Sequence, residues 1–324
     1  MPTHRAHFLL TLAAVLWGMQ PMFVKWLVQS MTPVTLTLMR YLLISLVMFV
    51  LLFWQKDSHR RPISPRNWML LALMGFSGIA INNIVQFEGL KLSTATNSTL
   101  IASASPTVTA ALAALFLKER LIPLQWVGML ISFFGALFLL TKGRLDVLLN
   151  LSFNRGDVYF VIAQTGWSVY ALLSVPVLRE ISATRAVAWS GLIGSALSAL
   201  WGIASGQLLF PPMTPGVLGA FAYITFGGGV CAMLCWNLGV RAVGASEASI
   251  FLNILLVIGL FCGVTFLDEP FRIQQGCGSL AILGGVYLLT HSHKVQAWRD
   301  THPSKRSLLQ LIRHPLRHLH RRAR

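Results

Sequence analysis

The chain carries the same sequence pattern twice. Residues 1–141, shifted by 150 positions, fall on the second half of the sequence without a gap. The segment FLKERLIPLQWVGMLISFFGALFLL at 116–140 falls on FLDEPFRIQQGCGSLAILGGVYLLT at 266–290. The positions that match include Phe116/Phe266, Leu117/Leu267, Glu119/Glu269, Gln125/Gln275, Gly128/Gly278, Leu130/Leu280, Gly135/Gly285, Leu139/Leu289, Trp17/Trp167, Gly89/Gly239 and Ala95/Ala245. Such internal symmetry predicts two structurally related halves.

The composition places both halves in a membrane. Of the 324 residues, 55% are hydrophobic and 11% are charged, and the mean hydropathy is +0.66. Soluble domains average roughly 45–50% apolar and about 25% charged residues. A soluble protein of this length could not bury so much apolar surface, so the sequence predicts a multi-pass membrane protein.

Ten segments are apolar over a length that spans a bilayer, for which a helix needs roughly 20 residues. They are residues 8–28, 34–54, 68–89, 93–117, 123–141, 157–178, 186–205, 215–240, 244–267 and 273–291. Their uninterrupted apolar runs lack the alternation of a membrane β-barrel. The expected fold is therefore an all-α membrane protein of ten transmembrane helices. Because each repeat holds five spans, an odd number, the second repeat is inverted relative to the first, as in many carriers.

The distribution of Lys and Arg predicts the orientation. With a cytoplasmic N-terminus, ten of these residues before position 292 fall inside and five outside, leaving aside Lys25 and Arg40 in or near helices. We therefore expect a cell-membrane protein with both termini in the cytoplasm. The expected divisions are an N-terminus 1–7, a first repeat 8–141, an outer connector 142–156, a second repeat 157–291 and a basic tail 292–324.

The basic tail also contains apolar residues, among them Leu308, Ile312 and Leu316. A basic amphipathic segment binds anionic lipid. Since Pro315 interrupts a helix here, we favour an irregular tail that associates with the membrane surface over a solvated tail. The net charge of +16 is explained mostly by orientation and by this tail, so no nucleic-acid partner is expected.

A set of motifs resembles the drug/metabolite transporter superfamily, in its ten-helix form with two EamA-type domains. The matching residues are Trp17-Gly18, Arg40-Tyr41 and the run EGLKLSTATNSTLIASASPTVTAALAALFLKERLIPLQWVGMLISFFGALFL at 88–139. The second half lacks counterparts of Arg40, replaced by Ser190, and of Pro106, replaced by Leu256. The resemblance covers about residues 8–291. It implies a carrier of small metabolites, often an exporter, with a central cavity lined by the first, third, fourth, sixth, eighth and ninth helices.

The residues themselves predict a polar and aromatic lining. Polar side chains inside hydrocarbon are costly and face the bundle interior or a cavity. The candidate substrate-binding residues are Trp17, Gln20, Asn82, Asn83, Gln86, Asn97, Trp167, Tyr170, Trp236, Asn237 and Glu247. Such a lining can hydrogen-bond neutral or zwitterionic solutes and stack flat ones. The alternative is that these residues only join helices by hydrogen bonds and packing.

Four charged positions bear on mechanism. Arg40 could grip an anionic group, but a structural role, through snorkelling or a pair with Glu88, is favoured. Glu119 and Glu269 are expected to cap or pair locally at helix ends. Glu247 is the best candidate for a proton-linked carboxylate, although no carboxylate falls at a helix centre, so coupling to a proton or a counter-solute stays open.

The sequence contains no signature of catalysis. It has no HExxH, GxSxG or GxxxxGK[ST] motif, and Cys231 and Cys235 lack the nearby ligands of a metal site. No catalytic residue, metal or cofactor is therefore expected. The favoured function is a secondary transporter, an exporter of an amino acid, nucleoside or drug-like solute by alternating access. The alternatives are a non-transporting membrane scaffold or sensor with this fold, and an intramembrane enzyme acting on lipid.

Overall fold

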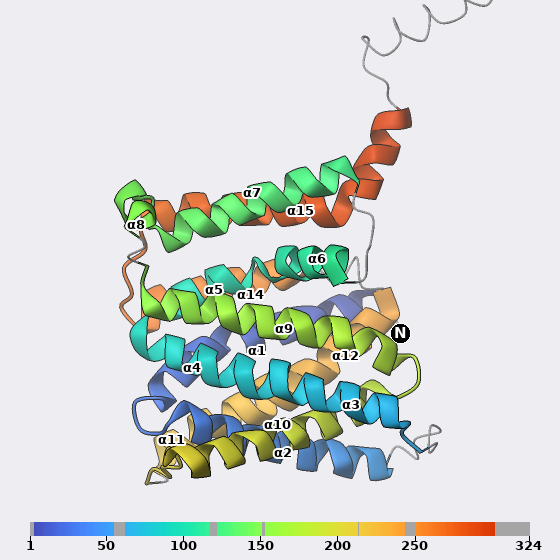
Figure 1. The fold of residues 1–324 in the computed structure, drawn as a ribbon, viewed down its shortest axis with the longest axis vertical. Coiled ribbons are helices and arrows are strands. Elements are labelled where there is room, and N and C mark those ends of the chain that lie inside the picture. The colour runs from blue at the N-terminus through green and yellow to red at the C-terminus, as the bar shows by residue number, and fades with distance from the viewer. Residues whose placement is uncertain are drawn as a thin grey trace, which may run out of the picture.

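The computed structural model describes residues 3–54, 62–116, 122–150, 153–212, 214–243 and 251–301, and every regular element in these ranges is a helix (Figure 1). The first repeat contains α1 (Thr3–Leu27), α2 (Pro33–Trp54), α3 (Pro65–Met74), η1 (Gly75–Ile81), α4 (Asn82–Leu92), α5 (Ala95–Ala102), α6 (Ser105–Phe116) and α7 (Pro123–Leu140). The connector holds α8 (Leu145–Leu149). The second repeat contains α9 (Arg155–Leu178), α10 (Ala183–Ser205), α11 (Pro215–Ala222), η2 (Tyr223–Cys231), α12 (Ala232–Val243), α14 (Leu252–Phe266) and α15 (Ile273–Thr301). The all-α prediction is confirmed.

Seven helices within the described ranges are long and apolar enough to cross a membrane, or eight if the bent pair α5 and α6 counts as one span. The seven are α1, α2, the continuous α3–η1–α4, α7, α9, α10 and the segment from α11 through η2 into α12. The expected span 244–267 is described only from residue 251 onward, and α15, which contains 273–291, is not among the seven. Ten spans are thus not fully confirmed.

The expected span over 93–117 is bent rather than straight, because α5 and α6 meet at an angle of 41°. Proline has no backbone N–H, so Pro106 cannot donate to the carbonyl of Ala102. The hydroxyl of Ser105 donates to that carbonyl instead, at 2.7 Å. The break therefore follows from one proline, and the displaced hydrogen bond is replaced locally.

Equivalent helices of the two repeats begin in the same way. Ser64 and Thr214, which are 150 positions apart, accept hydrogen bonds from the backbone N–H groups of Asn67 and Val217. A proline follows each cap, at the first helical position, where no N–H is needed. Such local agreement between the halves supports the internal repeat beyond the identical residues.

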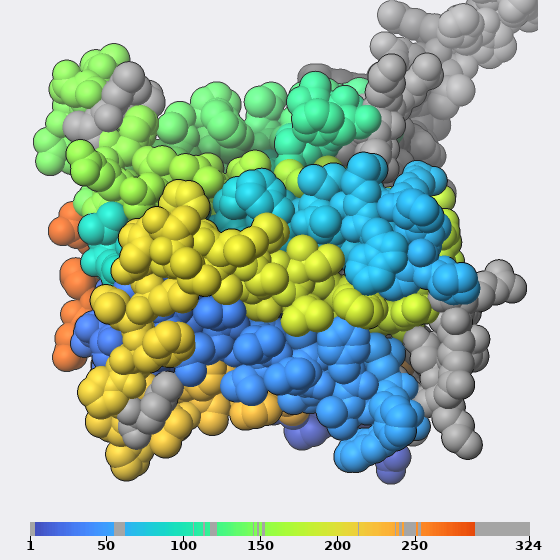
Figure 2. Space-filling model, turned by 60° about the horizontal axis from the view of Figure 1, so that its bottom comes forward, coloured from blue at the N-terminus to red at the C-terminus, as the bar shows by residue number. Residues whose placement is uncertain are grey.

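The two repeats do not form separate bundles, because their helices pair across the repeat boundary. The most extensive contacts join α2 to α10, α4 to α9, α1 to both α12 and α14, and α7 to α15. Figure 2 shows one face on which α2 (blue) and α3 (light blue) lie against α10 (yellow-green). α1 and α9, the first helices of the repeats, run in opposite directions (Figure 1), which is the inverted arrangement that five spans per repeat require.

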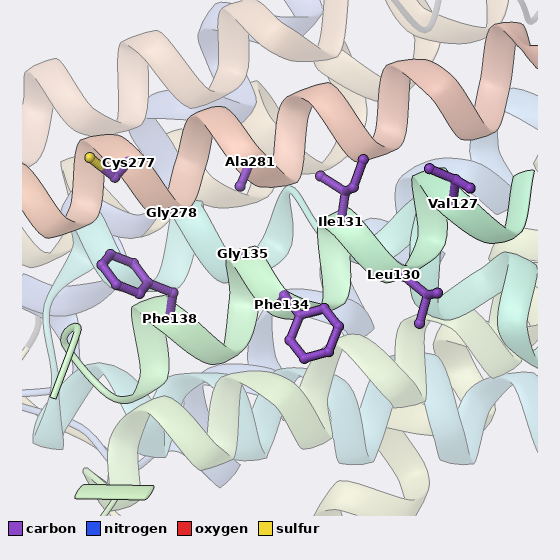
Figure 3. A pocket seen from close by; sticks show the side chains of 9 residues that line it. All are labelled: Val127, Leu130, Ile131, Phe134, Gly135, Phe138, Cys277, Gly278 and Ala281. Atoms are coloured by element: carbon purple, nitrogen blue, oxygen red, sulfur yellow. The ribbon is translucent and has the colours of Figure 1, made fainter. Parts of the chain in front are cut away.

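The pair α7 and α15 lies at the periphery of the bundle (Figure 1). Gly135 and Gly285 allow the two helices to approach closely, with a Cβ at Gly135 placed only 2.9 Å from Ala281 Cβ. Beside this seam is an apolar cavity of about 520 Å³, lined by Phe134, Phe138 and Cys277 among others (Figure 3). α15 continues to Thr301, so the expected boundary of the tail at 291 lies inside a helix. Residues 302–324, which hold most of the predicted lipid-binding tail, lie outside the described residues.

Candidate functional site

A polar cluster surrounds Arg40 inside the bundle. Arg40 is only 4% exposed and lies seven residues after the start of α2, about 10 Å along the helix axis. Its Nη2 donates to Gln20 Oε1 of α1 at 2.8 Å, and its Nη1 donates to Asn83 Oδ1 of α4 at 3.3 Å. Its Nε donates to the carbonyl of Ile224 in the second repeat at 3.2 Å. One guanidinium thus joins three helices of the first repeat to the second repeat.

The acceptors of this cluster come partly from two π-helices. η1 and η2 occupy equivalent positions in the two repeats, and short π segments occur often at functional sites because their widened turns alter the backbone hydrogen bonds. Asn83 Nδ2 donates to the carbonyls of Gly78 and Ile79 in η1, at 3.2 and 3.0 Å. Arg40 donates to η2 as described. The candidate side chains therefore bind backbone carbonyls at the middle of two spans.

Trp17 lies beside η2, the π-helix of the second repeat. Its indole Nε1 donates to the carbonyl of Gly228 at 2.8 Å, and its ring is tilted against that of Trp236, with the centroids 5.5 Å apart. A Cβ at Gly228 would lie 2.6 Å from Gln20 Oε1, so only glycine allows this approach without a shift. Trp17, Gln20, Trp236 and the Arg40 cluster thus form one continuous region at the interface of the repeats.

Two further candidates on α4, Asn82 and Gln86, differ in how firmly they are held. Asn82 Nδ2 donates to the carbonyl of Ala163 in α9 at 2.7 Å, and Asn82 is buried. Gln86 is half-buried and makes one long contact, from its Nε2 to Ser98 Oγ at 3.5 Å. Asn82 therefore has a clear structural hydrogen bond, whereas the amide of Gln86 is held weakly and is free to bind something else.

Trp167 and Tyr170 form a stacked pair on α9, with their ring centroids 5.2 Å apart and their planes at 9°. Tyr170 lies directly over Gly78 of η1, and Trp167 is 44% exposed. Tyr170 packs against the buried cluster that contains Leu71 and Met74. The pair presents a flat aromatic surface beside η1, on the side of the second repeat.

Asn97 lies elsewhere, in a second polar network at the end of the bundle where α1 and α4 end and α5, α9 and α15 begin. Its Nδ2 donates to Asp157 Oδ1 at 3.1 Å, and its Oδ1 accepts from Gln275 Nε2 at 2.6 Å. Asp157 is 1% exposed and also accepts from the hydroxyl of Ser93. Asp157 is a buried carboxylate that the sequence analysis missed, since it begins an apolar span and has no acidic counterpart in the first repeat.

Glu269 completes this second network with bonds that cross the repeats. Its Oε1 accepts from Lys25 Nζ at 2.7 Å and from the backbone N–H of Ala95 at 2.8 Å, and its Oε2 accepts from the N–H of Thr96 at 2.9 Å. A carboxylate at this position satisfies unpaired N–H groups and the positive end of α5. Glu269 thus caps a helix and forms an ion pair, but the expectation that its partners are local is wrong, because they lie about 170 and 240 positions away in the chain.

The pair of Arg40 with Glu88, one of the two structural roles considered, is also wrong. Glu88 lies on the surface, with Lys91 Nζ 3.3 Å from its Oε2, whereas Arg40 points into the bundle toward Gln20 and Asn83. α2 turns the guanidinium to the face that meets η2, and Glu88 pairs with Lys91 of its own helix instead. Glu119, the second acid expected to pair locally, lies outside the described residues.

Two candidate residues cannot be placed in the site. Asn237 belongs to α12, but its side chain is not described, and Glu247 lies outside the described residues. Among the parts of the chain that are described, no group of three or more His, Cys, Asp or Glu side chains could hold a metal ion. Besides the apolar cavity at the α7–α15 seam, a smaller one of about 110 Å³ lies at the second polar network, lined by Asn97, Lys142 and Arg272 among others.

Comparison with known proteins decides the family. The model of the EamA-like transporter family matches residues 4–141 and again residues 154–291. The chain belongs to the EamA-like transporter family. It is 26% identical over 263 residues to the uncharacterized transporter YyaM of Bacillus subtilis, covering 81% of this chain and 86% of that protein. It is 24% identical over 286 residues to an uncharacterized transporter of Archaeoglobus fulgidus, covering 88% and 97%. A crystal structure with 21% sequence identity has the same fold, with a TM-score of 0.56, 87% of this chain and 95% of that chain covered.

Membership identifies the chain as a membrane transporter of the drug/metabolite type and not as an enzyme. The two family matches cover the two sequence repeats in order. The resemblance read from Trp17-Gly18, Arg40-Tyr41 and the run 88–139 is thereby confirmed.

Proposed function

We propose that this member of the EamA-like family is a secondary transporter that exports a small organic solute by alternating access, with the Arg40 cluster and its aromatic neighbours as the central binding region. The observation that carries the proposal is the convergence of Gln20, Arg40 and Asn83 on the two π-helices at the interface of inverted repeats. In inverted-repeat carriers the substrate binds at this interface, near the middle of the membrane. Export is the direction suggested by the family resemblance.

The polar network of Glu269 and Asp157 fits the role of an outer gate in this proposal. Lys25 and Thr96 belong to the first repeat and Glu269 to the second, so their bonds hold the two repeats together at one end of the bundle. Asn97 and Gln275 make a further bond between the repeats there. Opening that end requires these bonds to break together, while the region around Arg40 keeps its own contacts. Two sets of polar contacts at different depths are what a gated carrier needs.

The test of the proposed function is solute counterflow in liposomes that contain the purified protein. We expect Gln86→Ala to reduce transport roughly 3- to 10-fold, the effect of one lost hydrogen bond to the solute. Because Gln86 makes only a 3.5 Å contact with Ser98, its thermal unfolding midpoint should change little. Gln29→Ala is the matched control, since Gln29 is an exposed amide in the turn after α1.

Equal transport by the Gln86 and Gln29 variants would remove Gln86 from the binding region. A complete lack of counterflow by the wild-type protein, for solutes of every class offered, would favour the scaffold alternative instead.

The orientation is a separate prediction. We expect the connector 142–156 on the outer side of the cell membrane and the loop around Ser58 in the cytoplasm, because Lys and Arg favour the cytoplasmic side by ten to five. Single cysteines at Asn150 and at Ser58, in a cysteine-free background, should react with an impermeant reagent from opposite sides of the membrane. Labelling of both positions from outside would contradict the inverted arrangement of the repeats.

A further inference from the structure

None of the described hydrogen-bond partners of Arg40 neutralises its charge. The guanidinium is permanently protonated and has five N–H donors. The contacts described use three of them, and all three acceptors, Gln20 Oε1, Asn83 Oδ1 and the carbonyl of Ile224, are neutral. The ion pairs in the described part of the chain join other residues: Lys25 to Glu269, Lys91 to Glu88 and Arg144 to Asp146. A charge inside the bilayer is costly and is normally paired.

The fold itself does not need this charge. The second repeat forms the equivalent junction, in which α9 and α10 pack against η1, with uncharged residues. Tyr170 stands at the position of Gln20, and Ser190 stands at the position of Arg40. Ser190 is fully buried, and Tyr170 lies over Gly78 of η1. Since one repeat builds this junction without an arginine, holding a π-helix against its neighbours is not a sufficient reason for Arg40.

We propose that Arg40 binds the carboxylate of the transported solute, so that the substrates are small molecules with a single carboxylate, such as amino acids or aromatic acids. This proposal rests on the proposed transport function and adds its substrate class. The two N–H groups without a described acceptor match the two oxygens of a carboxylate, which guanidinium binds in a forked geometry. A single positive charge balances a single carboxylate, whereas a phosphate monoester carries close to two charges and would require a second cation.

The neighbourhood suits the rest of such a solute. The ring of Tyr41 lies 5.4 Å from Arg40 Cζ and supports the guanidinium from one side. Trp17 and Trp236 present aromatic surface next to Gln20, and the amide of Gln86 lies one turn beyond Asn82 and Asn83 on α4. A flat or aliphatic body can therefore pack on the indoles while its carboxylate meets the guanidinium.

The experiment compares acids with their amides, which have nearly the same shape but lack the negative charge of the carboxylate. The probes are benzoate and benzamide, nicotinate and nicotinamide, and L-phenylalanine and L-phenylalaninamide, with uridine as an uncharged nucleoside. For the wild-type protein, we measure the concentration of each probe that half-saturates uptake into proteoliposomes and the shift in thermal unfolding midpoint that each produces. We expect at least one acid to be transported and to require a roughly 10- to 100-fold lower concentration than its amide, the effect of a charge-assisted hydrogen bond.

Variants then assign the preference to Arg40. Arg40→Gln should bring the acid-to-amide ratio close to one, and Arg40→Lys should keep part of the preference because it retains the charge without the forked geometry. Arg66→Gln is the control, since Arg66 is an exposed arginine at the start of α3, and it should leave the ratio unchanged. The ratio is informative because a purely structural loss would lower the uptake of acid and amide equally.

The outcomes separate the two proposals. Two results overturn the role of Arg40 but leave the transport function standing. In one, a probe is transported with no preference for the acid. In the other, the acid is preferred and both Arg40→Gln and Arg40→Lys retain that preference in full. If Arg40→Gln does not fold, the wild-type ratio and the Arg40→Lys ratio decide. Uptake of none of the probes by the folded wild-type protein contradicts the transport function, and the substrate class with it.

Discussion

Glu269→Ala should be among the most destabilising single substitutions in this chain. The variant leaves Lys25, whose side chain is 24% exposed, without its ion-pair partner, and it leaves the N–H groups of Ala95 and Thr96 without acceptors. Removing one member of a buried ion pair costs about 3–5 kcal/mol, because the remaining charge stays in a region of low polarity. The measurement is the thermal unfolding midpoint of the purified protein in detergent, together with the yield of monodisperse protein.

The matched comparison is Glu88→Ala, which removes the exposed ion pair with Lys91. Both side chains of that pair are more than a third exposed, at 35% and 37%, and exposed ion pairs contribute about 0–1 kcal/mol. Glu269→Gln should fall between the two, because the amide oxygen can still accept from one N–H group while the charge is lost. Equal stability of the Glu269→Ala and Glu88→Ala variants would show that the second polar network does not join the repeats.

The same substitution bears on the proposed gate. Weakening the bonds of Glu269 to Lys25 and α5 destabilises the conformation in which the outer end is closed. The protein then populates the conformation that is open at that end more often. We expect the Glu269→Gln variant to fold. A cysteine introduced at Asn97 should react faster with an impermeant reagent added from outside in this variant than in a protein that carries the same cysteine and keeps Glu269.

The architecture could be predicted well from the sequence, because the bilayer strongly restricts the secondary structure of the segments that cross it. Backbone polar groups in lipid must bond within their own segment, so long apolar runs can only be helices, and the 150-residue offset relates the two sets of spans. The prediction was less accurate where a single residue alters a helix. The bend between α5 and α6 follows from Pro106, and the two π-helices have no periodicity that distinguishes them from α-helix over so few residues.

The site was predicted only in part, for a physical reason. Hydropathy identifies which helices carry amides and aromatic rings, and Gln20, Asn83 and Trp17 do lie together at the interface of the repeats. Partners that cross the repeats depend on how helices are rotated and inclined, which the pattern of one helix does not specify. Arg40 was therefore given a structural role, through snorkelling or a pair with Glu88, and Glu269 was not connected to Lys25. The useful signal was available: two cations, Lys25 and Arg40, lie in spans that hold few acids.

Gly285→Val should separate α15 from α7. A Cβ at Gly285 would overlap the carbonyl oxygen of Gly128 and the backbone nitrogen of Ser132, and backbone atoms cannot move aside as a flexible side chain can. Because α15 packs far more extensively on α7 than on any other described helix, the new side chain forces the two helices apart over most of their contact. Overpacking of this kind costs about 1–3 kcal/mol and sometimes more, and close packing at small residues is what holds helices together in lipid. Gly284→Val, one residue earlier, is the control, since a Cβ there meets no atom within 4 Å while the change in helix propensity is the same. We expect the thermal unfolding midpoint in detergent to fall clearly for Gly285→Val and little for Gly284→Val; equal midpoints would contradict the close contact of α7 and α15.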